Sequence, residues 1–139
     1  MRHFFLSVIS ALFLNSSVIA EEFEKGFSAY KNGDYETARD LWSPLADQGD
    51  GRAQTNLGLM YEYGKGVPKN HKEAIKWYTL AAEQGFAEAQ TNLGVMYEEG
   101  EGTSRDLEKA IHWYEKAAEQ GFVEAQFNLG LMHYDGEGT

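Results

Sequence analysis

Carboxylates gather in two glycine-rich segments of this 139-residue chain, where a metal ion could in principle bind. Glu98, Glu99 and Glu101 lie in the first segment, and Asp135 and Glu137 lie in the second. A calcium loop needs oxygen ligands that alternate around a central glycine, followed by a closing glutamate. Neither segment has that alternation. We interpret these side chains as solvated loop charges and predict that the protein holds no metal.

Two Gly-x-Gly loops, Gly64 with Gly66 and Gly100 with Gly102, could be mistaken for phosphate-binding loops. A dinucleotide site places its glycines after a buried strand and at the start of a helix. Here the glycines join two predicted helices and lie several residues before the second one begins. The pattern therefore indicates tight connections in which glycine permits positive φ, and we predict no cofactor.

The remaining reactive side chains do not form a catalytic arrangement. His71, His112 and His133 show no i, i+4 pairing and no acidic neighbours suited to a metal site. The chain has no cysteine, which excludes a thiol nucleophile, a zinc thiolate site and a disulfide. We therefore predict a protein that is not an enzyme and that is stabilised by packing alone.

A six-residue stretch that occurs three times organises the chain. It reads Ala-Gln-Thr-Asn-Leu-Gly from Ala53 and from Ala89, and Ala-Gln-Phe-Asn-Leu-Gly from Ala125, so the period is 36 residues. A fixed period of about 20 to 50 residues is the signature of a solenoid built from identical units. The sequence therefore predicts an all-α repeat fold, which offers an extended surface rather than an enclosed pocket.

Each full unit, at residues 51–86 and 87–122, is predicted to be a helical hairpin. In the first unit Leu57 belongs to the apolar face of the first helix, and Trp77 and Tyr78 belong to the apolar face of the second. The two faces are expected to close on each other. This predicts that the tryptophans at these positions are core residues.

Several residue types predict where the helices begin and end. Gly58 and Gly94 lie inside the first helices, where a glycine indicates the close approach of a neighbouring backbone. The predicted N-caps are Asp34, Asn70 and Asp106, and the predicted terminating glycines are Gly49, Gly85 and Gly121.

The two ends of the array depart from the full unit. Residues 21–49 form a shortened opening hairpin, in which Pro44 is expected to kink or restart the second helix. Residues 123–139 begin a third unit, and the sequence breaks off before its second helix. We expect the chain to be part of a longer array.

The N-terminal 20 residues have the pattern of a signal peptide. A short cationic start precedes an apolar run at residues 4–14, and we predict cleavage after Ala20. The alternative is a membrane anchor, but the run is about half the ~20 apolar residues that a spanning helix needs. Loss of the positive charge of Arg2 takes the formal net charge from −10 to −11. So acidic a protein is repelled by nucleic acid phosphates, and no nucleic-acid role is expected.

The repeated residues resemble a known family. The units A-Q-T-N-L-G-x-M-Y-E-x-G-x-G followed by A-I-x-W-Y-x-x-A-A-E-Q-G closely resemble the Sel-one-like repeat, an α/α relative of the tetratricopeptide repeat. The opening hairpin looks more like a plain tetratricopeptide unit. The resemblance implies a right-handed superhelix that acts as an adaptor in protein complexes, often in the bacterial envelope.

The sequence departs from the family pattern in two ways. His133 stands where Tyr61 and Tyr97 stand in the complete repeats. Some exported relatives are rich in cysteine and associate with penicillin-like ligands, whereas this chain has no cysteine. The lack of cysteine argues against carrying that association over to this chain. The alternative function is an envelope enzyme or ligand binder acting on peptidoglycan or β-lactam-like molecules.

A possible binding face lies opposite Leu57 on the first helices. Apolar residues recur there, which indicates either a partner site or coverage by neighbouring first helices because of superhelical curvature. We predict an exported, non-catalytic scaffold that binds a protein or peptide of unknown identity on this concave face. The predicted partner-binding residues are Thr55, Leu59, Glu62, Thr91, Val95, Glu98, Phe127, Leu131 and Tyr134.

Overall fold

The computed structural model describes residues 15–136, and every regular element within that range is an α-helix. The helices are α2 (Ser16–Lys31), α3 (Tyr35–Asp47), α4 (Gly51–Tyr63), α5 (His71–Glu83), α6 (Ala87–Glu99), α7 (Leu107–Glu119) and α8 (Val123–Tyr134). Most of the predicted signal peptide lies outside the described residues, and so do the last three residues of the incomplete repeat. The all-α class predicted from the 36-residue period is confirmed.

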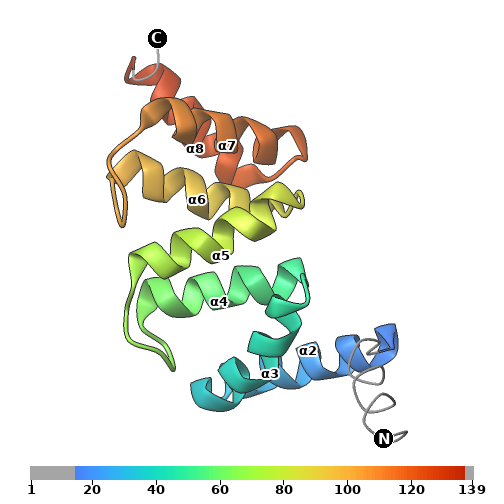
Figure 1. The fold of residues 1–139 in the computed structure, drawn as a ribbon. Helices are drawn as coiled ribbons and strands as arrows, with labels where there is room; N and C mark the ends of the chain where they lie inside the picture. Colours follow the sequence, from blue (N-terminus) through green and yellow to red (C-terminus); the bar gives the residue numbers. More distant parts are fainter. Residues whose placement is uncertain (1–14, 137–139) are drawn as a thin grey trace, which may run out of the picture.

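Consecutive helices pack as hairpins, α2 with α3, α4 with α5, and α6 with α7, and each hairpin packs on the next. Figure 1 shows the hairpins stacked one on another between the two ends of the chain. Helix α8 begins the third unit and packs against α7. The predicted solenoid is therefore formed by all the described repeats.

The helix starts confirm the predicted caps. The side chains of Asp34, Asn70 and Asp106 each accept a hydrogen bond from the backbone N–H three residues later, at 3.1 to 3.2 Å. Asp50 caps α4 in the same way and accepts from two backbone N–H groups of its first turn. The glycines predicted to end the helices, Gly49, Gly85 and Gly121, follow the C-caps with φ of 97°, 96° and 82°.

The Gly-x-Gly loops fasten each hairpin to the one before it. Gly66 and Gly102 have φ of 70° and 71°, which confirms the structural interpretation of these loops. A Cβ atom at Gly66 would lie 2.8 Å from the carbonyl oxygen of Tyr35, and one at Gly102 would lie 2.7 Å from the carbonyl carbon of His71. The Arg39 guanidinium also donates to the Gly66 carbonyl at 2.8 Å. Each loop thus lies against the start of the second helix of the preceding hairpin.

Three clusters of buried side chains run through the stack. Tyr78 and Tyr114 are fully buried in the second and third clusters, whereas Trp77 and Trp113 are only partly buried at cluster edges. The expectation that the tryptophans occupy the core is therefore wrong for these two repeats. The tyrosine, one residue further along the helix, points between the helices of its own hairpin and takes that place. The cluster residues are Ala38, Trp42, Leu45, Ala46, Ala53, Leu57 and Met60; Ala74, Tyr78, Ala81, Ala82, Ala89, Leu93 and Met96; and Ala110, Tyr114 and Met132.

The glycines inside the first helices, Gly58 and Gly94, leave room for the rings of these tyrosines. A Cβ atom at Gly58 would lie 2.4 Å from a ring carbon of Tyr78, and one at Gly94 would lie 2.6 Å from a ring carbon of Tyr114. The predicted close approach of a neighbouring backbone is therefore corrected. The close neighbour is an aromatic ring from the second helix of the same hairpin.

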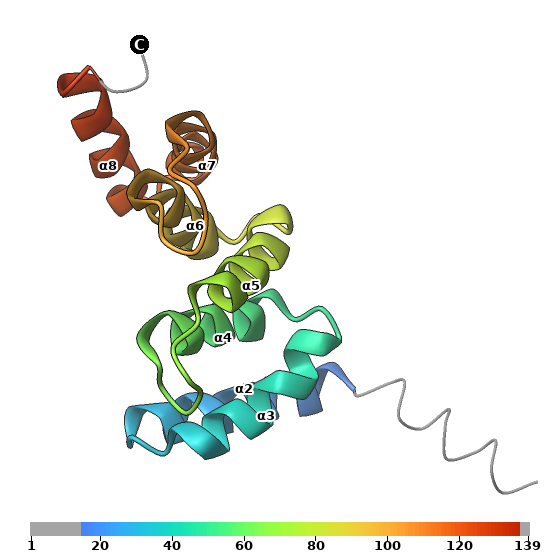
Figure 2. The same ribbon diagram turned by 60° about the vertical axis from the view of Figure 1, so that its left-hand side comes forward.

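Helix α3 continues through Pro44 without interruption. The Ser43 hydroxyl donates to the carbonyl of Arg39 at 2.7 Å, and Figures 1 and 2 show α3 changing direction within its length. Proline removes one backbone hydrogen bond and crowds the preceding turn. Of the two predicted outcomes, a kinked helix is the one observed.

A relay of glutamines joins three successive helices at each repeat junction. Gln54 is buried, donates to the carbonyl of Ala46 at 3.1 Å, and accepts from Gln84 at 2.8 Å. Gln90 and Gln120 repeat the contact at 3.0 Å one unit later. The first glutamine satisfies a carbonyl at the end of the previous hairpin, so the relay sets the register between repeats. Sequence reasoning missed this relay, although Gln54 and Gln84 each recur 36 residues later, as Gln90 and Gln120.

Candidate functional site: a groove along the first helices

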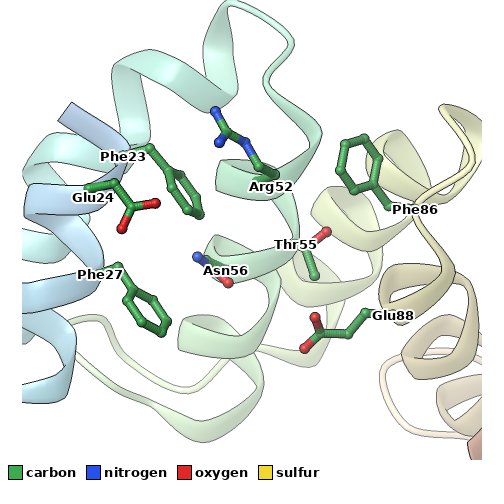
Figure 3. Close-up of a pocket in the computed structure, with 8 residues that line it drawn as sticks. All are labelled: Phe23, Glu24, Phe27, Arg52, Thr55, Asn56, Phe86 and Glu88. Carbon is green, nitrogen blue, oxygen red and sulfur yellow. The ribbon is translucent and has the colours of Figure 1, made fainter. Parts of the chain in front are cut away.

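A groove lies between the first helices of the repeats, with a volume of about 310 Å³. Helix α4 forms its floor, and α2 and the start of α6 form its walls (Figure 3). Its lining residues are Phe23, Glu24, Phe27, Arg52, Thr55, Asn56, Phe86 and Glu88.

A smaller cavity adjoins the groove and shares three lining residues with it. This apolar pocket has a volume of about 190 Å³. It is lined by Phe27, Tyr30, Trp42, Asn56, Leu59 and Glu88. The shared residues are Phe27, Asn56 and Glu88, so the groove and the pocket lie next to each other.

Aromatic rings supply most of the apolar surface at the N-terminal wall. The Phe23 ring stacks on the buried Trp42 with 5.9 Å between centroids, and the Arg52 guanidinium lies 4.3 Å from the Phe23 centroid. Phe27, one turn further along α2, is 45% exposed. A large apolar side chain left this exposed beside a cavity is a feature of binding surfaces.

Arg52 is the positively charged side chain of the groove, and it already forms an ion pair. Its guanidinium contacts the Asp50 carboxylate at 2.9 and 3.3 Å, and these hydrogen bonds raise the pKa of Arg52. Burial alone would raise the pKa of Asp50, but the hydrogen bonds from Arg52 and from the Ala53 N–H outweigh that effect and lower it. The pair therefore stays ionised and offers little charge to a ligand.

Glu88 is the uncompensated charge of the groove. Within residues 15–136 it forms no ion pair. Glu88 is exposed at the groove wall, where partial loss of solvent, and after it the negative charge of Glu124 on α8, raise the pKa of Glu88 above the usual value for glutamate. Arg52, Glu88 and Glu124 occupy the same position in successive repeats, so this line of the surface changes from basic to acidic along the array.

Two of the predicted partner-binding residues are buried. Thr55 is 4% exposed and Thr91 is 0% exposed. Their hydroxyls donate to the carbonyls of Gly51 and Ala87, each at 2.8 Å, four residues earlier in the same helix. Thr91 therefore does not face an open groove, because the stacked repeats close over that side of α6, whereas Thr55 lines the groove with most of its surface covered.

The predicted glutamates are bound within their own hairpins. The Tyr78 hydroxyl donates to Glu62 at 2.5 Å, and the Tyr114 hydroxyl donates to Glu98 at 2.5 Å. Burial, followed by these hydrogen bonds, raises the pKa of both tyrosines well above the usual value. Glu62 and Glu98 therefore serve as acceptors for buried phenols, a role that a helical wheel of one helix does not reveal.

The predicted apolar series divides into covered and uncovered members. Leu59 and Val95 are partly buried and pack against the second and third core clusters, so the next repeat covers part of each side chain, and Leu59 also lines the apolar pocket. Phe127, Leu131 and Tyr134 on α8 are 64%, 46% and 89% exposed. The same positions are thus at least partly covered in the complete repeats and open in the third.

Sequence reasoning missed five residues of the groove: Phe23, Phe27, Asn56, Phe86 and Glu88. That reasoning placed the free surface opposite Leu57, but packing between repeats moves it nearer to the start of α4 and α6. One signal in the sequence could have revealed this surface. Charged residues recur at positions 52, 88 and 124, and asparagine recurs at positions 56, 92 and 128.

The described residues hold no group of three or more His, Asp or Glu side chains placed to bind a metal ion. Among these residues, a histidine lies near a carboxylate at His71, whose Nδ1 is 3.8 Å from Oε2 of Glu101. In the same part of the chain, no helix is long and apolar enough to cross a membrane. The apolar run at residues 4–14 lies outside it.

Stacked helical hairpins with a groove along their first helices define this molecule as an α/α solenoid of the tetratricopeptide-like class. The Sel1 repeat model matches residues 19–50, 51–86, 87–122 and 123–139. The chain therefore belongs to the Sel1 repeat family, whose members generally mediate protein–protein interactions.

Solved and curated relatives agree with this assignment. A Sel1 repeat protein from Oxalobacter formigenes is 42% identical, with a TM-score of 0.80 over 85% of this chain and 47% of its own. The c5321 protein, a protective antigen of uropathogenic Escherichia coli, is 40% identical, with a TM-score of 0.80 over 86% of this chain and 27% of its own. The exopolysaccharide production negative regulator of Rhizobium meliloti (strain 1021) is 40% identical over 41% of this chain and 21% of its own. The chain thus spans less than half the length of each of these relatives.

Proposed function

We propose that this protein is a non-catalytic scaffold that binds a protein or peptide in the groove between α2, α4 and α6. The observation that carries the proposal is the position of Phe27, an exposed aromatic ring that lines both the groove and the adjoining pocket. Buried aromatic anchors dominate the binding energy of most protein interfaces. The family membership supports a binding role.

Site-specific photocrosslinking tests the location of the partner site. A photoreactive phenylalanine analogue at Phe27 is expected to crosslink a defined partner from cell extract. The same analogue at Leu80, which is 40% exposed on α5 outside the groove, is the matched control. Crosslinks from Leu80 alone, or none from Phe27, would contradict the assignment of the groove.

We also propose that the protein is exported to the bacterial envelope or secreted. The apolar run at residues 4–14 and the small residue Ala20 support export, and c5321 is described as a protective antigen of a pathogen. Helix α2 begins at Ser16, and Ile19 packs against the first core cluster. Cleavage after Ala20 would therefore remove the first turn of α2 and that contact.

N-terminal sequencing of the protein recovered from periplasm and medium tests this proposal. Material that starts at Glu21 is the expected result. Protein found only in the cytoplasm and starting at Met1 would contradict it.

A further inference from the structure

We propose that the groove and the apolar pocket together bind an extended protein segment that carries a lysine or arginine beside a bulky apolar side chain. The proposal rests on the proposed function and specifies the chemistry of the partner. Three features of the site support it: the shape and lining of the pocket, the charge balance of the groove, and a polar group on its floor.

The apolar pocket fits one side chain. Its walls are Phe27, Tyr30, Trp42 and Leu59, and its volume of about 190 Å³ is below the ~300 to 1,000 Å³ that is usual for small-molecule sites. Tyr30 and Trp42 are held in place against each other, with 5.7 Å between ring centroids. A fixed aromatic pocket of this size suits a single aromatic or large aliphatic side chain of a partner.

Carboxylates line the mouth of the pocket, and the Lys31 ammonium lies on the α2 side, 5.6 Å from the centroid of the Phe27 ring. Glu88 lines both the pocket and the groove, and Glu24 lines the groove opposite it. Arg52 is neutralised by Asp50 and lies on the Phe23 ring. A cation from the partner next to its apolar side chain would therefore meet an unpaired carboxylate.

The groups near Glu88 add to this negative balance. Glu24 on α2 and Glu124 on α8 are carboxylates, Tyr78 on α5 is a buried phenol whose pKa is raised, and Arg52 on α4 is paired. Partial loss of solvent and the charge of Glu124 raise the pKa of Glu88, and a bound cation would favour its charged form. The whole chain, at a net charge of −10, also attracts a basic partner.

Asn56 lies on the floor between the pocket and the groove. Its side chain forms no hydrogen bond with another described residue, and an amide both donates and accepts. It is therefore placed to pair with the backbone of an extended segment. Such hydrogen bonds to the backbone would not depend on the side chains of the partner.

An NMR titration with defined peptides tests the proposal on the full chain. Three acetylated and amidated peptides share the frame Gly-Ser-x-z-x-Ser-Gly: Lys-Phe-Lys, Glu-Phe-Glu and Lys-Ala-Lys at the centre. We expect Lys-Phe-Lys to shift the amide signals of Asn56 and Glu88. Each of the other two peptides should bind at least about five-fold more weakly, which corresponds to the loss of one favourable contact.

Matched variants locate the interaction. Glu88→Gln should weaken Lys-Phe-Lys binding about five-fold, and Phe27→Ala should weaken it by a similar factor. Glu83→Gln removes the same charge from an exposed position on α5 outside the groove and should leave binding unchanged. Acidification from neutral pH should weaken binding to the wild type more than to Glu88→Gln, because Glu88 loses its charge at a higher pH than an ordinary glutamate.

The outcomes separate this inference from the proposed function. Equal or tighter binding of Glu-Phe-Glu overturns the charge assignment, and binding that survives both Glu88→Gln and Phe27→Ala overturns the location. Absence of shifts with all three peptides, together with a protein crosslinked at Phe27, overturns the partner chemistry while the groove remains a binding site. Absence of crosslinking at Phe27 contradicts the proposed function itself.

Discussion

Tyr78 and Tyr114 join the two helices of each complete repeat through both their rings and their hydroxyls. The rings fill the space left by Gly58 and Gly94, and the hydroxyls donate to glutamates of the facing helix at 2.5 Å. A buried phenol with a satisfied hydroxyl contributes packing without the penalty of an unpaired polar group. At the residue scale these tyrosines, rather than the tryptophans before them, hold each hairpin closed.

Tyr114→Ala should lower the free energy of unfolding by about 3 to 5 kcal/mol, as expected when a buried aromatic side chain is truncated. Trp113→Ala should cost less, because Trp113 is only partly buried. Urea denaturation of both variants measures the difference. A larger loss for Trp113→Ala would show that the tryptophan carries the packing.

Gly94→Ala should destabilise the protein by about 1 to 3 kcal/mol through overpacking. The new Cβ atom would lie 2.6 Å from a ring carbon of Tyr114, and this clash outweighs the ~1 kcal/mol that alanine gains in helix propensity. Gly130→Ala, at the same position one repeat later, has open space around it and should stabilise α8 by up to about 1 kcal/mol. Thermal melts of the two variants should therefore shift in opposite directions, and shifts of the same sign would refute this explanation of the glycines.

At the element scale, the start of α4 is fixed by Asp50, which caps the helix and binds Arg52 at the edge of the groove. Asp34 and Asn70 cap α3 and α5 without forming an ion pair to another described residue. Because the Asp50 cap of α4 also binds the groove residue Arg52, the start of α4 couples the junction between the first two hairpins to the proposed binding surface.

Asp50→Ala should cost about 1 to 2 kcal/mol at pH 7, and Asp50→Asn should cost less because asparagine keeps the cap. The folded-state pKa of Asp50 is lowered, so its stabilisation is complete above the unfolded pKa of about 3.9 and is lost as the pH falls through the folded value. The gap between wild type and Asp50→Ala should therefore narrow on acidification. Urea denaturation between pH 7 and pH 3 measures it, and a gap that widened would contradict the assigned sign.

The whole molecule is a one-dimensional stack in which each repeat is stabilised by its neighbours. The glutamine relays and Gly-x-Gly loops link adjacent units. Helices α6 and α8 carry nearly the same motif, but the outer face of α6 is covered and that of α8 is exposed. Stability should consequently decrease toward α8.

Amide hydrogen exchange of the 139-residue chain should show this gradient. The central amides of α8 should exchange at least about ten-fold faster than the equivalent amides of α6, because fewer buried contacts oppose local opening. Equal protection of the two helices would indicate that the stack unfolds only as a single unit.

The sequence determined the repeat, the helix boundaries and the family, because these depend on local patterns. The 36-residue period, the caps at Asp34, Asn70 and Asp106, and the positive-φ glycines in the loops are all decided within one or two turns of the chain. Helical periodicity likewise identified Leu57 and Leu93 as core residues, since the two helices of a hairpin close on each other directly.

Only the tertiary structure decided which surface of the first helices stays free. Thr91 and Val95 point away from the core of their own hairpin, yet the next repeat covers them, and Glu62 is bound by a tyrosine 16 residues away. The groove beside Phe27 and Glu88 likewise forms from three helices of different repeats. Coverage of this kind depends on how hairpins are rotated against each other, and that rotation is set by packing between side chains far apart in the sequence.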